Sequence, residues 1–290
     1  LLLLFLAACD SQQTSEEESS LDGLGTAGVE ITTPFSSSST TENGGTVSTK
    51  VRLKSAPLSP VTITLNSSDT QEGTVSPTVL TFNKDNWDSY VSIIVTGVDD
   101  DIADGSQSYE IQIASVVSED SKYSALNGQI NPIKLQNEDD EIKAIVLGSL
   151  SGDTTEAGGN ATFSVKLASK PIEAVSIPII STDTSEGTVS VSSLSFDNSN
   201  YNTVQIVTVN GEDDDERDGN KAYQVKIGPT SSNSLPYNNV ESLTHSITNI
   251  DNETSGVTVS STNITTDEAG GTSTFSVKLV TKPSKDVTIN

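Results

Sequence analysis

Two short loops of this chain concentrate carboxylates, and they occupy the same place in two successive repeats. Residues 97–105 have the sequence GVDDDIADG, and residues 211–219 have the sequence GEDDDERDG. Carboxylates this close repel one another: at about 5 Å and an effective dielectric of ~20, each pair costs ~3 kcal/mol. Ca²⁺ accepts about six to eight oxygen ligands in a flexible geometry. The loops therefore predict a counter-ion, and Ca²⁺ suits them best.

Acids recur at four places in each repeat, which we call stations. In the first repeat they are Glu42, then Asp69 and Glu72, then Asp99, Asp100, Asp101 and Asp104, then Glu138, Asp139 and Asp140. In the second repeat they are Glu156, then Asp183 and Glu186, then Asp213, Asp214, Asp215 and Asp218, then Asp251 and Glu253. Alternate loops of an antiparallel sandwich gather at one end, so the four stations are predicted to meet there as a calcium cage.

Other residues recur with the same spacing and define the repeats. Paired glycines begin at Gly44, Gly158 and Gly270. A proline follows at Pro57, Pro171 and Pro283. The spacing predicts repeats over residues 27–141 and 142–253 and a partial repeat over 254–290.

The elements that must hold these stations are predicted to be strands. Apolar residues alternate with period two within each repeat, as in Val51 and Leu53 or Val175 and Ile177, which buries one face of each strand. About seven short strands per repeat, separated by turn residues, predict an all-β chain of tandem antiparallel β-sandwiches with a truncated third copy. A parallel β-helix is the alternative, but its repeat would be several times shorter.

The third repeat is predicted to end inside its third strand, at 287–289, which matches Val61–Ile63 of the first repeat. Two or three strands cannot close a sandwich. We therefore expect this piece to be poorly ordered or to pair through its open edges, and further repeats to follow it in the intact protein.

The composition argues against polyanionic partners. The chain has 290 residues, 40 acidic and 15 basic side chains, and a formal net charge of −25. Nucleic acid and anionic lipid would be repelled. The alternative is that the acidity only keeps an exported protein soluble, although the acids cluster in loops.

The N-terminus has the pattern of a bacterial lipoprotein signal. Residues 1–9 are apolar and end in Leu6-Ala7-Ala8-Cys9, which resembles a lipobox and implies that Cys9 is lipidated. Residues 10–26 are polar and predict a flexible tether. No initiator Met or basic segment precedes the apolar run, so the start of the signal is expected to be missing. Cys9 is the one cysteine of the sequence, so no internal disulfide is possible.

Each repeat resembles a Calx-beta domain, the β-sandwich module of sodium–calcium exchanger regulatory loops, integrin β4 and many bacterial surface proteins. The resemblance rests on the acid-Gly-Gly turn, the Asp-rich loop before a Tyr-x-Val/Ile-x-Ile strand, and the acidic end of the repeat. It implies calcium ligands at these stations: Glu42, Asp69, Asp99, Asp100, Asp104, Asp139 and Asp140 in the first repeat, and Glu156, Asp183, Asp213, Asp214, Asp218, Asp251 and Glu253 in the second.

The sequence departs from the family pattern at two places. Asp104 and Asp218 stand where family members often carry the longer Glu. The middle turn also differs from the family pattern. The ligand there is therefore either Asp69 or Glu72 in the first repeat, and either Asp183 or Glu186 in the second. Acidic loops that bind no metal remain the alternative, since some Calx-beta domains bind none.

Enzymatic activity is disfavoured. The one histidine of the sequence, His245, lies in a predicted strand, and the corresponding segment of the first repeat has none. A zinc site is also disfavoured, because the sequence offers only one His and one Cys as ligands, and that Cys is predicted to be lipidated. Paired carboxylates such as Asp69 and Glu72 could act as acid and base, but their duplication and the scarcity of aromatic residues argue against a glycosidase.

Two functions fit the sequence. The first is a lipid-anchored cell-surface protein of the bacterial envelope, whose repeats bind Ca²⁺ and form a stiff rod for adhesion or for binding an unknown protein or surface ligand. The second is a metal-free acidic spacer that presents a functional domain beyond residue 290. Calcium sensing or buffering is a third possibility, and it requires a conformational change.

Overall fold

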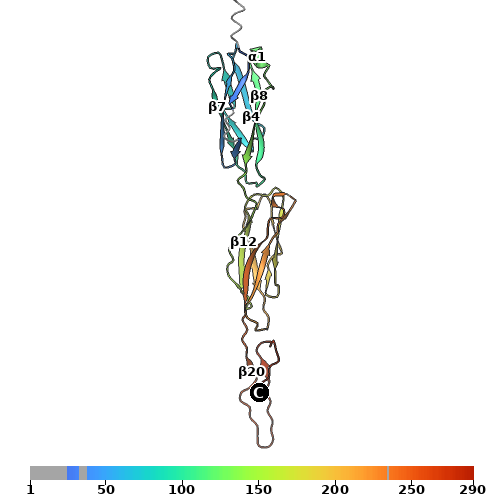
Figure 1. The fold of residues 1–290 in the computed structure, drawn as a ribbon. Helices are drawn as coiled ribbons and strands as arrows, with labels where there is room; N and C mark the ends of the chain where they lie inside the picture. Colours follow the sequence, from blue (N-terminus) through green and yellow to red (C-terminus); the bar gives the residue numbers. More distant parts are fainter. Residues whose placement is uncertain (1–24, 33–37, 234) are drawn as a thin grey trace, which may run out of the picture. The chain divides into compact units, whose positions relative to one another are not determined.

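The computed structural model describes residues 25–32, 38–233 and 235–290, which are nearly all strands and loops (Figure 1). The predicted lipobox with Cys9, and most of the tether, lie outside the described residues. Contacts divide the chain into two compact units. The first runs to Asp140 without Asp101–Ala103; the second comprises Asp101–Ala103 and Glu141–Asn290.

The first unit is a sandwich of two sheets. One sheet has the order β1-β3-β7-β5, and the other has the order β2-β9-β8-β4-β6. The strands are β1 Val29–Thr32, β2 Ser39–Thr41, β3 Thr46–Leu53, β4 Val61–Ser67, β5 Gly73–Ser76, β6 Val79–Phe82, β7 Val91–Gly97, β8 Gln107–Val117 and β9 Ile133–Glu138. The short helix α1, Ser121–Ser124, follows β8.

The second unit repeats this topology. Its sheets have the orders β10-β12-β16-β14 and β11-β19-β17-β13-β15, with β18 beside β13. The strands are β10 Ile145–Leu147, β11 Thr154–Thr155, β12 Asn160–Leu167, β13 Val175–Ser181, β14 Gly187–Val189, β15 Ser193–Phe196, β16 Gln205–Gly211, β17 Lys221–Ile227, β18 Ser231–Ser232 and β19 Leu243–Ile250. The 3-10 helix η1, Leu235–Tyr237, lies where α1 lies in the first unit. The fold is therefore all-β and built from tandem sandwiches, as predicted.

The described strands number nine in the first sandwich and ten in the second, more than the predicted seven, in part because the opening strand of each repeat is divided between the two sheets. In the second unit, β10 pairs antiparallel with β12, whereas β11 pairs parallel with β19. In the first unit, β1 and β2 pair with β3 and β9 in the same two ways. The first strand thus lies beside the last strand of its own repeat.

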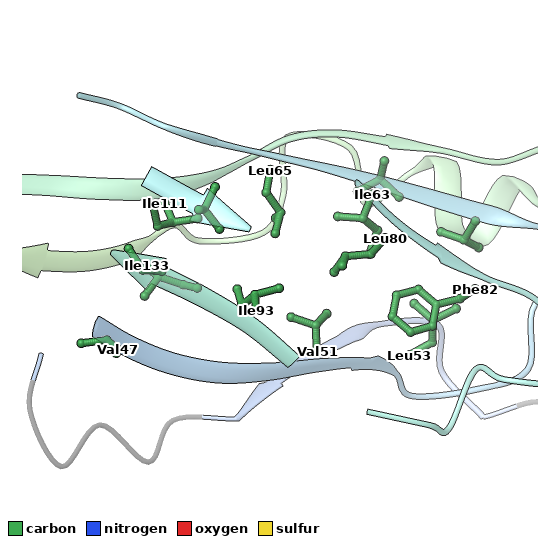
Figure 2. Close-up of a cluster of buried hydrophobic side chains, with 14 of the residues drawn as sticks. Val47, Val51, Leu53, Ile63, Leu65, Leu80, Phe82, Ile93, Ile111 and Ile133 are labelled. Atoms are coloured by element: carbon green, nitrogen blue, oxygen red, sulfur yellow. The ribbon is translucent and has the colours of Figure 1, made fainter. Parts of the chain in front are cut away.

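Alternation along the strands builds the core. In β3, Val47, Thr49, Val51 and Leu53 are buried, while the residues that alternate with them are exposed or partly covered. The three apolar side chains belong to one cluster with Ile63 and Phe82 of the facing sheet, and Figure 2 shows Phe82 at the Leu53 end of that cluster. Burying each such side chain contributes about 1.5–3 kcal/mol. The second unit has its own separate core.

The last segment forms a two-stranded pair, β20 Val257–Val259 with β21 Val277–Leu279. The predicted strand at 287–289 does not form. In the complete repeats, the equivalent strands β4 and β13 pair with strands that come later in the repeat. Residues 254–290 contain no such strands, so the backbone there has nothing to pair with.

Candidate metal centre

The acid-Gly-Gly turn of the second repeat places a buried carboxylate between the first and last strands. Gly158 and Gly159 donate backbone hydrogen bonds to Thr155 O, and Gly158 has a φ of +86°, which glycine adopts without strain. Glu156 N donates to Ile250 O at 3.1 Å, which extends the parallel pairing by one residue. The turn therefore holds Glu156, only 4% exposed, beside the end of β19.

Three carboxylates converge at this point. Each of Glu156, Asp251 and Glu253 offers an oxygen within 4.8 Å of the other two. Asn252 N donates to Glu156 Oε2 at 3.1 Å, and Glu253 N donates to Asp251 Oδ1 at 2.7 Å. Gly219 N donates to Asp251 Oδ2 at 2.6 Å, which ties the Asp-rich loop to the cluster. We call Glu156, Asp251 and Glu253 the carboxylate triad.

The protonation equilibria of the triad reflect crowded negative charge. The pKa of Glu253 is raised to about 7, first by a hydrogen bond that its carboxyl group shares with Glu156, and then by partial burial and the charges of Glu156 and Asp251. The pKa of Asp251 is lowered, first by the backbone N–H of Glu253 and next by that of Gly219. The raised pKa of Glu253 therefore reflects the crowding of negative charge at the triad.

The Asp-rich loop reaches the triad through one of its aspartates. Asn252 Nδ2 donates to Asp213 Oδ1 at 3.1 Å, so Asp213 lies at the edge of the triad. Asp214 Oδ1 instead accepts from Glu216 N at 2.6 Å and caps the loop's own turn. Asp215 is exposed. The structure therefore joins Asp213 to the triad more directly than Asp214 or Asp215.

A second acidic group of the same repeat surrounds Glu186. Burial raises the pKa of Glu186 most, and the charges of Asp218, Asp183 and Glu156 raise it further, whereas the amide of Asn249 lowers it. The Lys221 Nζ lies 2.8 Å from Asp218 Oδ2. The pKa of Lys221 is raised by that carboxylate first, and the charges of Glu186 and Asp214 contribute further.

The middle station gives Glu186 and Asp183 different positions. Glu186 is 9% exposed and its Oε2 lies 3.5 Å from Asn249 Nδ2, whereas Asp183 is exposed and accepts from Ser185, which lowers its pKa. In the first repeat, Glu72 is half-buried and Asp69 is exposed. Of the two alternatives that the sequence left open, the glutamate is the better placed at each middle station.

The first repeat assembles the same stations. Glu42 is 2% exposed, and its ligand oxygen lies within 4.8 Å of that of Asp140. Asp139 Oδ2 accepts a hydrogen bond from Gly105 N, as Asp251 does from Gly219. Desolvation raises the pKa of Glu72 first, and the charges of its neighbours raise it further; these neighbours are Asp104, Asp69 and Asp100. Asp99 and Asp101 are exposed.

One difference between the repeats concerns positive charge. Lys221 begins β17, and Gln107 begins β8 at the corresponding place. Gln107 Nε2 donates to Gly105 O at 3.0 Å and carries no charge. The second repeat therefore has a lysine ammonium among its carboxylates, where the first has a neutral amide.

Two buried asparagines, which the sequence prediction omitted, connect the stations. Asn249 is fully buried; its Nδ2 donates to Glu212 O at 2.8 Å and lies 3.5 Å from Glu186 Oε2. Asn137 repeats both contacts with Val98 O and Glu72 Oε2 in the first repeat. An Asn on the buried face of an apolar strand, recurring at the same place of both repeats, is the signal that could have identified them.

His245 contributes to packing. It lies in β19 as predicted, its Nε2 is 3.1 Å from Gly148 O, and its ring centroid is 4.9 Å from that of Phe163. Among the described residues, His245 forms no ion pair with a carboxylate. Among those residues, too, no helix has the length and apolar content needed to cross a membrane.

The triad has the chemistry of a calcium site. Ca²⁺–oxygen bonds of about 2.3–2.6 Å let one ion bridge oxygens up to roughly 5 Å apart, which fits the 4.8 Å limit of the triad. The donors are all carboxylates, so a hard cation is preferred over zinc or copper. The triad and Asp213 would hold the ion, which would supply the positive charge that the cluster lacks.

The chain was compared with known proteins. No family model and no curated protein matches it. Solved structures that resemble it include CBD12 from CALX1.2, at 14% identity and a TM-score of 0.31 over 68% of this chain and 79% of that one. The calcium binding domain CBD12 of CALX1.1 is 14% identical, with a TM-score of 0.27 over 66% of this chain and 77% of that one. Domains 4 and 5 of the S-layer protein SbsC are 14% identical, with a TM-score of 0.29 over 65% of this chain and 75% of that one. At these values none of them assigns a family to the chain.

Proposed function

We propose that this chain is a surface protein of Calx-beta type that binds Ca²⁺ at the acidic end of each complete repeat. The observation that carries the proposal is the carboxylate triad, whose three oxygens lie within 4.8 Å of one another. The raised pKa of Glu253 supports it, because the crowded negative charge that raises the pKa of a carboxyl group also favours a divalent cation in place of the proton.

Binding would stiffen the protein. The triad joins the turn after β11 to the segment that follows β19 and leads into the next repeat. An ion held by both would restrict movement where one repeat passes into the next. A series of stiffened repeats, anchored to the bacterial envelope through lipidated Cys9, would suit adhesion or the binding of another surface molecule, and no enzymatic step is part of this proposal.

The metal-free spacer remains a second candidate, and Lys221 favours it for one repeat. Its ammonium pairs with Asp218 at 2.8 Å and relieves part of the repulsion without an ion. Since Gln107 provides no such charge, the first repeat needs a cation more than the second does.

Calcium titration by calorimetry, with thermal unfolding in calcium and in chelator, tests the proposal. A ligand that binds only the folded state at about 100 times its Kd stabilises it by ~2.7 kcal/mol. Replacing two ligands, Glu156→Gln with Glu253→Gln, should weaken binding by the second repeat at least about tenfold. Glu173→Gln, an exposed change outside the stations, is the control. Absence of binding heat, with equal melting temperatures in calcium and chelator, would leave the spacer function.

A further inference from the structure

The side chain of Asn249 connects the four acidic stations of the second repeat. Asn249 is fully buried in β19, two residues before the last station at Asp251. Its Nδ2 donates at 2.8 Å to Glu212 O, at the start of the Asp-rich loop, and lies 3.5 Å from Glu186 Oε2 at the middle station. Its Oδ1 accepts at 3.0 Å from Thr154 Oγ1, in the strand that leads into the first station. One amide thus contacts segments that carry all four stations.

Hydrogen bonds fix the direction in which this amide points. A backbone carbonyl and a carboxylate can only accept, so the Nδ2 group of Asn249 must face Glu212 O and Glu186. On the other side, Thr154 Oγ1 donates to Oδ1 and also lies 3.1 Å from the hydroxyl of Tyr223, which is buried. The amide therefore extends a buried chain of hydrogen bonds from the aromatic core to the acidic end of the repeat.

The backbone beside the amide leaves no room for a side chain. A Cβ built at Gly211, the last residue of β16, would lie 2.7 Å from Asn249 Oδ1 and would also overlap Thr155 O. The next residue, Glu212, donates its backbone N–H to Glu186 O at 3.1 Å. The close approach of β16 to Asn249 thus holds the start of the Asp-rich loop against the middle station.

The first repeat contains the same network. Asn137 is fully buried in β9, accepts from Thr40 Oγ1 at 2.9 Å and donates to Val98 O at 2.8 Å. Thr40 Oγ1 lies 2.9 Å from the Tyr109 hydroxyl, and Asn137 Nδ2 lies 3.4 Å from Glu72 Oε2. The chain of Tyr, Thr, Asn and Glu is therefore a feature of the repeat and not of one copy.

We propose that Asn249, oriented by Thr154, is a positioning residue that holds the acidic stations at the spacing that a calcium ion requires, and that Asn137 and Thr40 do the same in the first repeat. Crowded carboxylates repel one another and separate unless a rigid support opposes them. The amide provides that support without adding charge. The functional consequence rests on the proposed calcium site, but the positioning itself belongs to the metal-free fold.

Amide hydrogen exchange of the whole chain in chelator, followed by NMR, tests the positioning. Thr154→Val removes the hydroxyl that orients Asn249. It should accelerate exchange at the amides of Glu156 and Glu212, which bond to neighbouring stations, by about two- to tenfold, the effect of one hydrogen bond. Thr154→Ser keeps a hydroxyl and should restore slow exchange. Thr230→Val is the matched control, because Thr230 is also buried and hydrogen-bonded in this repeat but lies outside the stations.

Calcium titration of the same variants tests the consequence, at a temperature where each variant is fully folded. Thr154→Val and Asn249→Asp should each weaken binding by the second repeat at least about tenfold. Thr230→Val should not, even if it lowers the melting temperature equally. Asn249→Asp adds a negative charge, so a site governed by charge alone would bind Ca²⁺ more tightly. The first repeat is unaltered in these variants and serves as an internal reference.

The outcomes are distinct. Unchanged exchange at Glu156 and Glu212 in Thr154→Val, or tighter calcium binding by Asn249→Asp, would overturn the inference. Equal losses of calcium affinity in Thr154→Val and Thr230→Val would also contradict it, since they would reflect stability alone. If the unaltered protein gives no binding heat with calcium, the proposed function fails, and the exchange measurement in chelator still decides the positioning.

Discussion

At the scale of the residue, Glu253 links the stability of the metal-free protein to pH. Its pKa rises from 4.5 to about 7 in the folded chain, so the folded state holds a proton that the unfolded state releases. Its contribution to stability is therefore complete below about pH 4.5 and is lost as the pH rises through about 7.

We predict that in chelator the melting temperature of the second repeat falls between pH 4.5 and about 7. Glu253→Gln should flatten this part of the profile, because an amide keeps its hydrogen at every pH. Thermal unfolding across the pH range measures the effect, with Glu173→Gln as control. A variant profile parallel to that of the unchanged protein would assign the slope to other groups.

The sequence alone predicts the acids of the triad as ligands, because charge is visible in composition and the repeat supplies their spacing. It did not separate Glu186 from Asp183, since only the folded chain shows which of the two is buried. Asn249 was missed for a related reason: an amide attracts attention only when its burial and its hydrogen-bond partners are known.

At the scale of the element, the start of β14 is fixed by a close approach. A Cβ at Gly187 would overlap the hydroxyl end of Tyr223, which is buried and hydrogen-bonded to Thr154 at 3.1 Å. Gly73 and Tyr109 have the same relation in β5. Glycine is therefore required there by the neighbouring ring and not by a positive φ.

We predict that Gly187→Ala lowers the free energy of unfolding by about 1–3 kcal/mol, the usual cost of overpacking. Chemical denaturation measures it. Gly152→Ala is the control, because a Cβ there meets nothing within 4 Å. Equal stability of the two variants would mean that Tyr223 moves aside freely.

The elements themselves were largely predictable, because the alternation of Val51 and Leu53 or Val175 and Ile177 gives each strand one apolar face. The division of the opening strand between two sheets was not. β11 spans only Thr154–Thr155, and its place beside β19 depends on the partner strand, since two residues carry no periodicity of their own.

At the scale of the whole molecule, two separate apolar cores predict two unfolding transitions. Phe82 and Phe196 occupy equivalent, fully buried positions in the two cores. Each change to alanine should cost about 3–5 kcal/mol and lower one transition only. Differential scanning calorimetry measures both. A single transition that moves with either variant would show that the two units unfold together.

The parallel pairing of first and last strands has a mechanical consequence. The chain enters β11 at one end of the pair and leaves β19 at the opposite end, so tension along the chain loads their hydrogen bonds in shear and breaks them together instead of one at a time. Glu156 follows β11, and Asp251 and Glu253 follow β19. A cation bound by these three would crosslink the two loaded strands. The force needed to unfold one repeat would then rise with the calcium concentration of the surrounding medium.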